Sequence, residues 1–395
     1  MNILYHHRTQ GRGAEGVHII SIVNALIAQG HEVTVLSPPG INPLSSAGNA
    51  PVDKSNVDTK GVNSLWKFIS KNLPNFVFEF IEIAYNIPAM QRLEKELSTN
   101  KYDMIYERYA FYMVAGVIKA NKYNIPLVLE ANEVNGIKDR ARKQSFKWLC
   151  NIFEKYLFKR CKSIHTVSSY LKSMILKQGV YDSAVIVTPN AIDPLKFSGT
   201  KDSGDLRKKY NLENKVVVGF AGWFDDWDRL DILINVFNDL KKVHTNIALL
   251  LVGDGAVLNI VREKAKSYNI ESDVILTGAV TRETVQQYLS LLDIAIITHS
   301  NEFGSPVVMF EFMGLKVPIV APRLLPITDV LSHDKNALIF DVLNVQQLKD
   351  QLTRLIVDEP LRVDIADNAY KKLMLDHTWH KNAEQIIFSS GLSEG

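Results

Sequence analysis

The sequence predicts an α/β protein of two doubly wound domains that face each other across a cleft, each a parallel sheet with helices on both faces. Short apolar runs alternate with segments of helical periodicity up to about residue 188, and a second series of the same kind begins at Lys215. A length of 395 residues also favours two domains over one. We expect the domains at residues 1–185 and 186–375, with a final helix, 376–395, that crosses back to the first domain.

The composition is that of a globular protein with a large core, with 46% hydrophobic and 22% charged residues. The net charge of +2 gives no sign of a nucleic-acid partner. A signal peptide and an apolar run long enough to span a membrane are both missing from the sequence, so we expect a cytoplasmic protein. Cys150 and Cys161 lack metal or redox spacing, and we expect both to be reduced, buried thiols.

The first domain opens with a strand at residues 1–5, a glycine-containing loop and a helix at 14–29 that ends at Gly30. A strand at 32–36 completes a βαβ unit. Further strands are expected at residues 102–106, 126–130, 164–167 and 185–188.

Two segments of this domain have more than one interpretation. Residues 65–97 are helical in outline, broken near Pro74 and Pro88, and their aromatic residues either pack on the sheet or form a flap that faces the acceptor or a membrane. Residues 138–177 are strongly basic, which is typical of a solvated helix face, with peripheral binding to an anionic membrane as the alternative. No RNA-reading aromatic motif accompanies this charge, so we expect no nucleic-acid partner.

The second domain ends several of its strands in glycine-containing loops. We expect the strands at residues 216–221, 247–252, 274–277, 294–297, 317–321 and 337–339. Loops at one edge of a sheet would form a nucleotide-sized pocket, in which glycine lets the backbone approach phosphate. The glycines are Gly222, Gly253, Gly278 and Gly304.

The stretch from Asn301 to Pro322 is the most informative part of this domain. Its turn would place the backbone N–H groups of a helix N-terminus at the carboxyl end of a strand, which is an anion site. Glu311 lies in that helix among apolar residues, and an acid in such surroundings needs a partner. A pair of sugar hydroxyls would serve.

Two strands of the first domain deliver acids at their carboxyl ends, where open α/β sheets bind ligands. Glu107 stands at one strand end, and Glu130 and Glu133 flank Asn132 at the other. The structural alternative for each acid is a helix cap or an internal ion pair, such as Glu107 with Arg108.

Five motifs together resemble the family 4 retaining glycosyltransferases, which have the GT-B fold. They cover nearly the whole chain in the order and spacing of that family. They are GAEGVH at 13–18, VTPNAID at 187–193, LLLVGDG at 249–255, TGAV at 277–280 and the stretch 301–322. The chain looks most like members that carry YERY, here at 106–109, before an acidic strand end such as 129–132.

The resemblance implies a nucleotide-sugar donor bound mainly by the second domain. Glu311 would bind the ribose hydroxyls through charge-assisted hydrogen bonds, the backbone of Val280 would contact the base, and the turn from Ser305 to Val307 would hold the diphosphate. The other donor-side residues are Gly11, Gly13, Gly222, Gly253, Gly304 and Pro306. The acceptor-side residues are Glu15, His18, Glu107 and Arg108.

The sequence departs from the family pattern at the position eight residues before the ribose acid, where a second acid is usual. Phe303 stands there, and Glu302 lies one place earlier. Either Glu302 substitutes for the missing acid, or backbone atoms of the Gly304 turn hold the sugar.

A second departure replaces the basic pair that usually clamps the diphosphate with Asp225 or Asp226 and with Asp228. Three interpretations are open. The aspartates cap the helix that begins near Arg229, and Arg229 takes the phosphate role. Alternatively, Asp226 and Asp228 bind a divalent metal, or donor binding is weakened and the chain is a non-catalytic partner subunit.

We therefore expect transfer of a hexose, with retention, from a nucleoside diphosphate sugar, UDP-sugar favoured, to a hydroxyl of a polysaccharide or lipid-linked acceptor, without cofactor or metal. Arg229 and the helix N-terminus would stabilise the leaving diphosphate. On the catalytic side, Glu130 and Glu133 would orient the acceptor hydroxyl. Asn132 stands where the family usually has a histidine, which weakens a role as base at that position. Domain closure would exclude water. A GT-B nucleotide-sugar epimerase is the rival enzyme.

Overall fold

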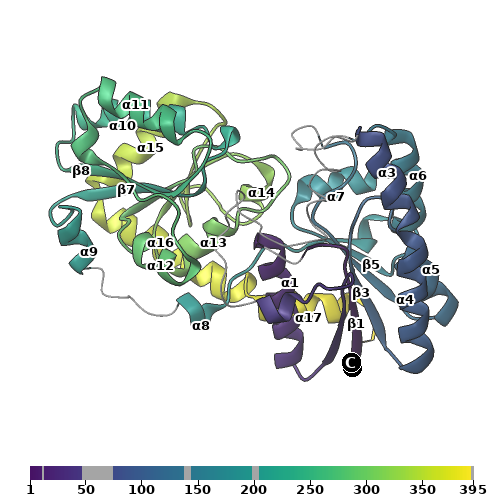
Figure 1. Ribbon diagram of the computed structural model, residues 1–395. Coiled ribbons are helices and arrows are strands. Elements are labelled where there is room, and N and C mark those ends of the chain that lie inside the picture. Colours follow the sequence, from purple (N-terminus) through teal and green to yellow (C-terminus); the bar gives the residue numbers. More distant parts are fainter. Residues whose placement is uncertain (11–12, 47–73, 138–143, 198–203, 393–395) are drawn as a thin grey trace. The chain divides into compact units, whose positions relative to one another are not determined.

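The computed structural model describes residues 1–10, 13–46, 74–137, 144–197 and 204–392 (Figure 1). Its contacts divide the chain into two compact units, Met1–Thr188 with Trp379–Gly395, and Pro189–Thr378. Each unit has its own sheet of six parallel strands with helices around it, so the predicted pair of doubly wound α/β sheets is confirmed.

The sheet of the first unit has the strand order β2-β1-β3-β4-β5-β6. Its strands are β1 Asn2–His6, β2 Glu32–Leu36, β3 Met104–Arg108, β4 Leu127–Ala131, β5 Ser163–Thr166 and β6 Val185–Val187. Its helices are α1 Gly13–Ala28, α3 Asn75–Ala84, α4 Asn86–Thr99, α5 Ala115–Tyr123, α6 Lys147–Phe158, α7 Ser169–Leu176 and α17 Trp379–Ser389, with short 3-10 turns η1 Pro43–Ser46 and η2 Asp182–Ala184.

The sheet of the second unit has the strand order β12-β11-β10-β7-β8-β9. Its strands are β7 Val216–Trp223, β8 Ile247–Asp254, β9 Val274–Leu276, β10 Ile294–Ile296, β11 Ile319–Pro322 and β12 Leu338–Phe340. Its helices are α8 Pro194–Phe197, α9 Gly204–Lys209, α10 Leu230–Lys241, α11 Leu258–Ser267, α12 Arg282–Leu289, α13 Val307–Gly314, α14 Leu325–Thr328, α15 Val345–Val357 and α16 Glu359–Asp376, with 3-10 turns η3 Asp226–Asp228 and η4 Glu271–Asp273.

The twelve strands all lie within two residues of their expected bounds. The strands of the second unit are nearly continuous apolar runs, as expected for strands buried on both faces by helices, whereas β3, β4 and β5 of the first unit include polar residues. In the second unit one apolar core lies under α10, α11 and α15, and the other lies under α12 and α13.

Each sheet reverses its direction of winding at one point, where ligands of open α/β sheets usually bind. In the first unit the reversal lies between β1 and β3, and in the second it lies between β7 and β10. The loops after these four strands therefore carry the residues that matter most for function.

The C-terminal helix α17 belongs to the first unit, where it packs against α1. Ser389 near its end bonds to two residues of β5: its hydroxyl oxygen lies 2.8 Å from the Ser163 hydroxyl and 2.8 Å from Nε2 of His165. The buried His165 ring is held at its other side by Thr188, whose Oγ1 is 2.8 Å from Nδ1. These bonds fix the returning chain to the sheet.

The aromatic segment of the first unit differs in detail from its prediction. Residues 65–73 lie outside the described residues, and α3 begins directly after Pro74. The helix breaks at Tyr85, between α3 and α4, and not at Pro88. Pro88 lies in the first turn of α4, where a residue without an N–H group loses no intrahelical hydrogen bond.

Several smaller expectations are settled by the structure. Ser168 caps α7 by accepting a bond of 3.3 Å from the Leu171 N–H, as predicted. Cys150 and Cys161 are both free, the first buried and the second partly buried. Of the helices in the described ranges, none combines the length and apolarity needed to cross a bilayer.

Candidate functional site

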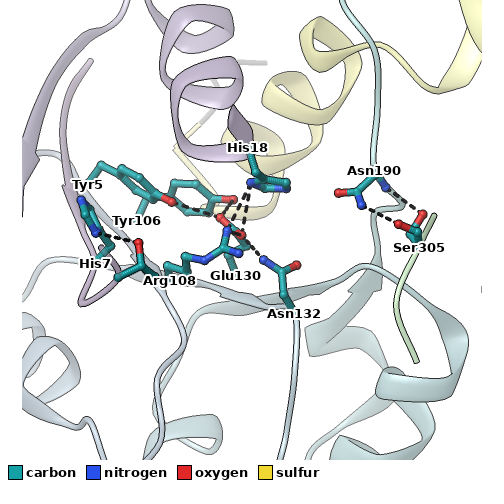
Figure 2. Close-up of polar contacts among 10 residues, drawn as sticks. Tyr5, His7, His18, Tyr106, Arg108, Glu130, Asn132, Asn190 and Ser305 are labelled. Carbon is teal, nitrogen blue, oxygen red and sulfur yellow. Dashed lines mark hydrogen bonds and ion pairs between the residues drawn. The ribbon is translucent and has the colours of Figure 1, made fainter. Parts of the chain in front are cut away.

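A buried carboxylate, Glu130, is the centre of a polar cluster at the carboxyl edge of the first sheet (Figure 2). The register of the parallel strands β3 and β4 pairs Arg108 with Glu130, so both side chains point to the same face. The Arg108 guanidinium makes an ion pair with Glu130, and both side chains are nearly excluded from solvent. Strand register alone therefore brings together two of the residues that the sequence singled out.

Four further groups surround this carboxylate. The hydroxyls of Tyr5 and Tyr106 donate to Oε2 at 3.3 and 3.2 Å, and Nδ2 of Asn132 donates to Oε1. Nδ1 of His18, on α1, lies 3.3 Å from Oε1. Burial alone would raise the pKa of Glu130, but the Arg108 charge and the hydrogen bonds from Asn132 and Tyr106 outweigh it and hold that pKa below its ordinary value.

His18 connects this cluster to the returning helix. Its ring packs edge-on against Trp379, the first residue of α17, with centroids 4.7 Å apart. Burial lowers the pKa of His18 to about 4 in spite of the Glu130 charge, so the imidazole is neutral at physiological pH.

Glu107 lies on the opposite face of the same strand, because neighbouring residues of a strand point to opposite faces. The suggested ion pair between Glu107 and Arg108 is therefore wrong. Glu107 instead contacts His6 of β1, its register partner, with Oε2 2.6 Å from Nδ1. Both residues are buried, so this pair belongs to the interior of the sheet.

The other residues predicted on the acceptor side differ in burial and in hydrogen bonding. Protein groups already occupy both carboxylate oxygens of Glu130. Its role is therefore to position Arg108 and Asn132. The Asn132 amide is fixed by that contact, and its Oδ1 is buried without a hydrogen-bond partner among the described residues. Glu15 is exposed in the first turn of α1, and Glu133 is half-buried beyond β4. Gly11 lies outside the described residues, whereas Gly13 begins α1.

In the second unit, the turn before α13 is organised by two asparagines. Oδ1 of Asn301 accepts from the backbone N–H groups of Phe303, at 3.2 Å, and Gly304. Asn190 holds Ser305: its N–H donates to the Ser305 hydroxyl at 3.2 Å and its Nδ2 donates to the Ser305 carbonyl at 2.7 Å (Figure 2). Among the described residues, the N–H groups of Val307 and Val308 at the start of α13 have no hydrogen-bond partner, whereas that of Met309 donates to the Pro306 carbonyl at 3.2 Å.

Glu311 lies one turn into α13, and its carboxylate differs from that of Glu130. No hydrogen bond or ion pair to it occurs within the described ranges, and neighbours Phe310 and Phe312 are fully buried. Burial raises the pKa of Glu311 to about 7, and the nearby Arg282 lowers it only in part. This is the partly buried acid without a protein partner that the sequence pattern predicts.

The acidic loop after β7 folds onto itself. Asp225 caps the short turn η3 through a capping box in which the Asp228 carboxylate accepts from the Asp225 N–H at 3.0 Å. The aspartates therefore cap η3 and not the helix that follows, which corrects that detail of the prediction. Burial raises the pKa of Asp228 to about 7, which reduces the negative charge of the loop near neutral pH.

Arg229, the residue expected to contact phosphate, is the N-cap of α10 with φ +51°. Its Nε and Nη2 donate to the two carboxylate oxygens of Asp231 at 2.9 and 3.1 Å. A phosphate contact by Arg229 would therefore compete with this ion pair.

The loops at the reversal point of the second sheet contact each other. Nδ1 of His299, after β10, donates to the carbonyl of Trp227, after β7, at 3.0 Å. Glycine is required at position 253 by the backbone itself. Its φ is +135°, and a Cβ added there would lie 1.9 Å from the Gly222 carbonyl oxygen. Val280 lies before α12, partly buried against the core.

Tyr5, Tyr106 and Asn190 are partners in these sites that the sequence pattern does not single out. Strand register would have identified the two tyrosines, because Tyr5 and Tyr106 are paired across β1 and β3. Asn190 lies inside the quoted 187–193 motif, but its partner Ser305 is 115 residues away.

A metal site finds no support in the described part of the chain, in which no three His, Cys, Asp or Glu side chains cluster as ligands. Asp228 is engaged with the Asp225 backbone. Metal independence remains a prediction.

Two family models match the chain, one to each half. The model described as Glycosyltransferase Family 4 matches residues 15–195, and the model described as Glycosyl transferases group 1 matches residues 202–372. The chain belongs to the family 4 glycosyltransferases. It is therefore a transferase enzyme.

Relatives of this glycosyltransferase are distant in sequence. An uncharacterized glycosyltransferase of Methanocaldococcus jannaschii is 24% identical over 325 residues, which cover 82% of this chain and 85% of the relative. The N-acetyl-alpha-D-glucosaminyl L-malate synthase of Bacillus anthracis is 26% identical over 173 residues, covering 43% of this chain and 44% of that protein. A GDP-mannose-dependent phosphatidylinositol monomannoside mannosyltransferase of Mycobacterium tuberculosis is 22% identical over 199 residues, covering 49% and 52%.

Solved structures agree with the fold. Anabaena HepE in complex with UDP has a TM-score of 0.72 at 17% identity, covering 99% of this chain and 100% of that chain. A glycosyltransferase from Rickettsia africae has a TM-score of 0.73 at 14% identity, covering 99% of both chains. The fold of this glycosyltransferase is GT-B.

The buried ion pair gives a prediction for stability. Arg108→Met leaves the Glu130 charge buried without its counter-ion, which costs about 3 to 5 kcal/mol. The double variant Arg108→Met with Glu130→Gln should recover part of that loss. Urea unfolding at pH 7 measures both, with Arg160→Met at an exposed helix end as the control.

The pH dependence of this stability has a defined sign. The pKa of Glu130 is lower in the folded state than in the unfolded state. The contribution of Glu130 to folding stability is therefore present above its unfolded pKa and is lost as the pH falls through its folded pKa. A loss of only about 1 kcal/mol in Arg108→Met, as for an exposed pair, contradicts the account.

Proposed function

We propose that this enzyme transfers a hexose, with retention at the anomeric carbon, from a nucleoside diphosphate sugar to a hydroxyl of a polysaccharide or lipid-linked acceptor. Glu311 is the observation that carries the donor half of this proposal. A partly buried carboxylate that has no partner among the described residues, near a helix N-terminus, fits a ribose diol next to a diphosphate. UDP is the favoured nucleotide, in keeping with HepE, which was solved with UDP and with UDP-glucose.

The chemistry needs positive charge or aimed dipoles where the diphosphate leaves. The N–H groups of Ser305 and Val307 supply the dipoles, because the Gly304 N–H is donated to Asn301 and Pro306 has none. The Asn190 contacts hold Ser305 in place. Arg229 supplies charge once it exchanges Asp231 for phosphate. We assign no metal or cofactor to this step.

The first unit takes the acceptor. Glu130 acts as a positioning residue, because its contact orients the Asn132 amide and leaves Oδ1 as the hydrogen-bond acceptor for a substrate hydroxyl. Glu133 and Glu15 lie at the same carboxyl edge as further polar contacts for that substrate.

Donor recognition is tested by binding of UDP and GDP. Glu311→Ala removes two charge-assisted hydrogen bonds to ribose, so UDP affinity should fall about tenfold or more. Isothermal calorimetry or the thermal shift produced by UDP measures this loss. Glu271→Ala, an exposed acid of the same unit, is the control and should bind as the parent does.

Two further arms complete this test. Arg229→Ala should weaken UDP but not uridine, and hydrolysis of UDP-glucose should be insensitive to EDTA. Equal UDP affinity in the parent and Glu311→Ala would remove Glu311 from the donor site. Loss of UDP-glucose hydrolysis in the presence of EDTA would contradict the metal-free step.

We also propose that the enzyme works in the cytoplasm, in peripheral contact with an anionic membrane. Helices α3 and α6 lie side by side, since the Ser145 and Phe146 N–H groups donate to Glu79. On these two helices the apolar residues Phe76, Phe80, Trp148 and Ile152 are exposed. The exposed charges of α6, Lys147 and Lys155, are basic, whereas its acid Glu154 is buried. Exposed apolar side chains together with exposed basic ones fit an anionic lipid surface.

Membrane contact is measured by co-sedimentation with vesicles that contain phosphatidylglycerol. Trp148→Glu places a charge among these exposed apolar side chains and should reduce the bound fraction severalfold, as should 0.5 M salt. Phe388→Glu, a similarly exposed aromatic on α17, is the control. Equal binding by Trp148→Glu and the parent would contradict the assignment of these side chains to the membrane contact.

A further inference from the structure

Two arginines lie against one tyrosine at the carboxyl ends of β1 and β2 in the first unit. Arg8 follows β1, Arg92 belongs to α4, and Tyr85 lies between α3 and α4. Their guanidinium carbons are 5.8 and 5.3 Å from the centre of the Tyr85 ring. The Arg8 loop borders the point where the sheet reverses its winding, where ligands bind in this kind of fold.

Both guanidinium groups are held in place by the protein. Arg8 donates to the Phe111 carbonyl at 3.1 Å and to the Glu82 carboxylate at 3.0 Å. Arg92 donates to the Ser37 carbonyl at 3.1 Å and to the Tyr85 hydroxyl. The carbonyls belong to residues that follow β2 and β3, so the two cations are fixed to the edge of the sheet.

The charge of this pair is not balanced within the described residues. Glu82 serves Arg8, but no carboxylate of the described ranges lies within ion-pair distance of Arg92, whose Nε is buried without a partner. The adjacent His7 adds no charge, because burial lowers its pKa to about 4. Burying a guanidinium charge that has only neutral hydrogen-bond partners is unfavourable, and a bound anion would offset that cost.

We infer that Arg8 and Arg92 bind an anionic group, a phosphate or a carboxylate, of the acceptor. This inference rests on the proposed function, in which the first unit takes the acceptor, and adds that the acceptor carries a negative charge besides its reacting hydroxyl. Guanidinium groups bind phosphate and carboxylate through paired, charge-assisted hydrogen bonds. The Tyr85 ring lies within cation–π distance of both guanidinium groups and helps to hold them in place.

The test uses the full chain saturated with UDP, so that the donor site cannot take the probe. Inorganic phosphate is titrated by calorimetry at constant ionic strength. Arg92→Gln should bind phosphate about tenfold more weakly or worse, because charged hydrogen bonds are lost. Arg8→Gln should also weaken binding, and Arg92→Lys should retain part of it. Arg160→Gln, which removes an exposed cation just after α6, should bind phosphate as the parent does.

Two results would overturn the inference. The first is that Arg92→Gln and Arg8→Gln bind phosphate as tightly as the parent does. The second is that the UDP-saturated parent does not bind phosphate. Unfolding of Arg92→Gln does not remove the test, because Arg8→Gln and Arg92→Lys address the same site. The proposed donor site fails separately: Glu311→Ala should lose UDP but keep phosphate, whereas Arg92→Gln should keep UDP.

The source of the anion is distinguished by two probes. Glycerol 3-phosphate stands for a soluble acceptor, and vesicles with phosphatidylglycerol stand for a lipid headgroup, with Trp148→Glu included to separate membrane contact from headgroup binding. Weaker binding of either probe in Arg92→Gln supports the site and identifies its source. Unchanged binding of both probes in Arg92→Gln contradicts the site.

Discussion

A carboxylate that is buried at the carboxyl edge of a parallel sheet must find a partner, and the two units of this enzyme meet that requirement differently. Glu130 has its counter-ion, Arg108, in the next strand, and three further side chains complete its hydrogen bonds. Glu311 has no such partner in the described ranges, and its pKa rises to about 7. The first arrangement stabilises the protein, and the second leaves an acid that a ligand can complete.

This difference follows from where the strands end. Register pairs Arg108 with Glu130 and turns Glu107 to the other face, toward His6. The second unit instead places its acid on a helix after β10, beside a turn whose conformation Asn301 and Asn190 fix with side-chain hydrogen bonds. Binding groups are thus positioned by protein contacts before any substrate arrives, which lowers the cost of binding.

The strands could be predicted because buried parallel strands are continuous apolar runs bounded by turns, and Glu311 because it is an acid among aromatics in a short helix. Partners were harder to predict. Arg108 and Glu130 are 22 residues apart and Asn190 and Ser305 are 115 apart, so only register or tertiary packing brings them together. The acidic loop at Asp225 was misassigned in detail, because a 3-10 turn of three residues leaves almost no periodicity to read.

The ionisation of Glu311 tests the central claim, that this carboxylate recognises the donor ribose. Carbon-13 NMR of glutamate carboxyl groups, assigned with Glu311→Gln, gives its pKa with and without saturating UDP. In the free enzyme the value should lie near 7, so stability falls as the pH rises from the unfolded pKa toward 7. A ribose diol stabilises the ionised form, so UDP should lower the pKa by about one unit or more. A pKa that UDP leaves unchanged or raises would contradict the claim.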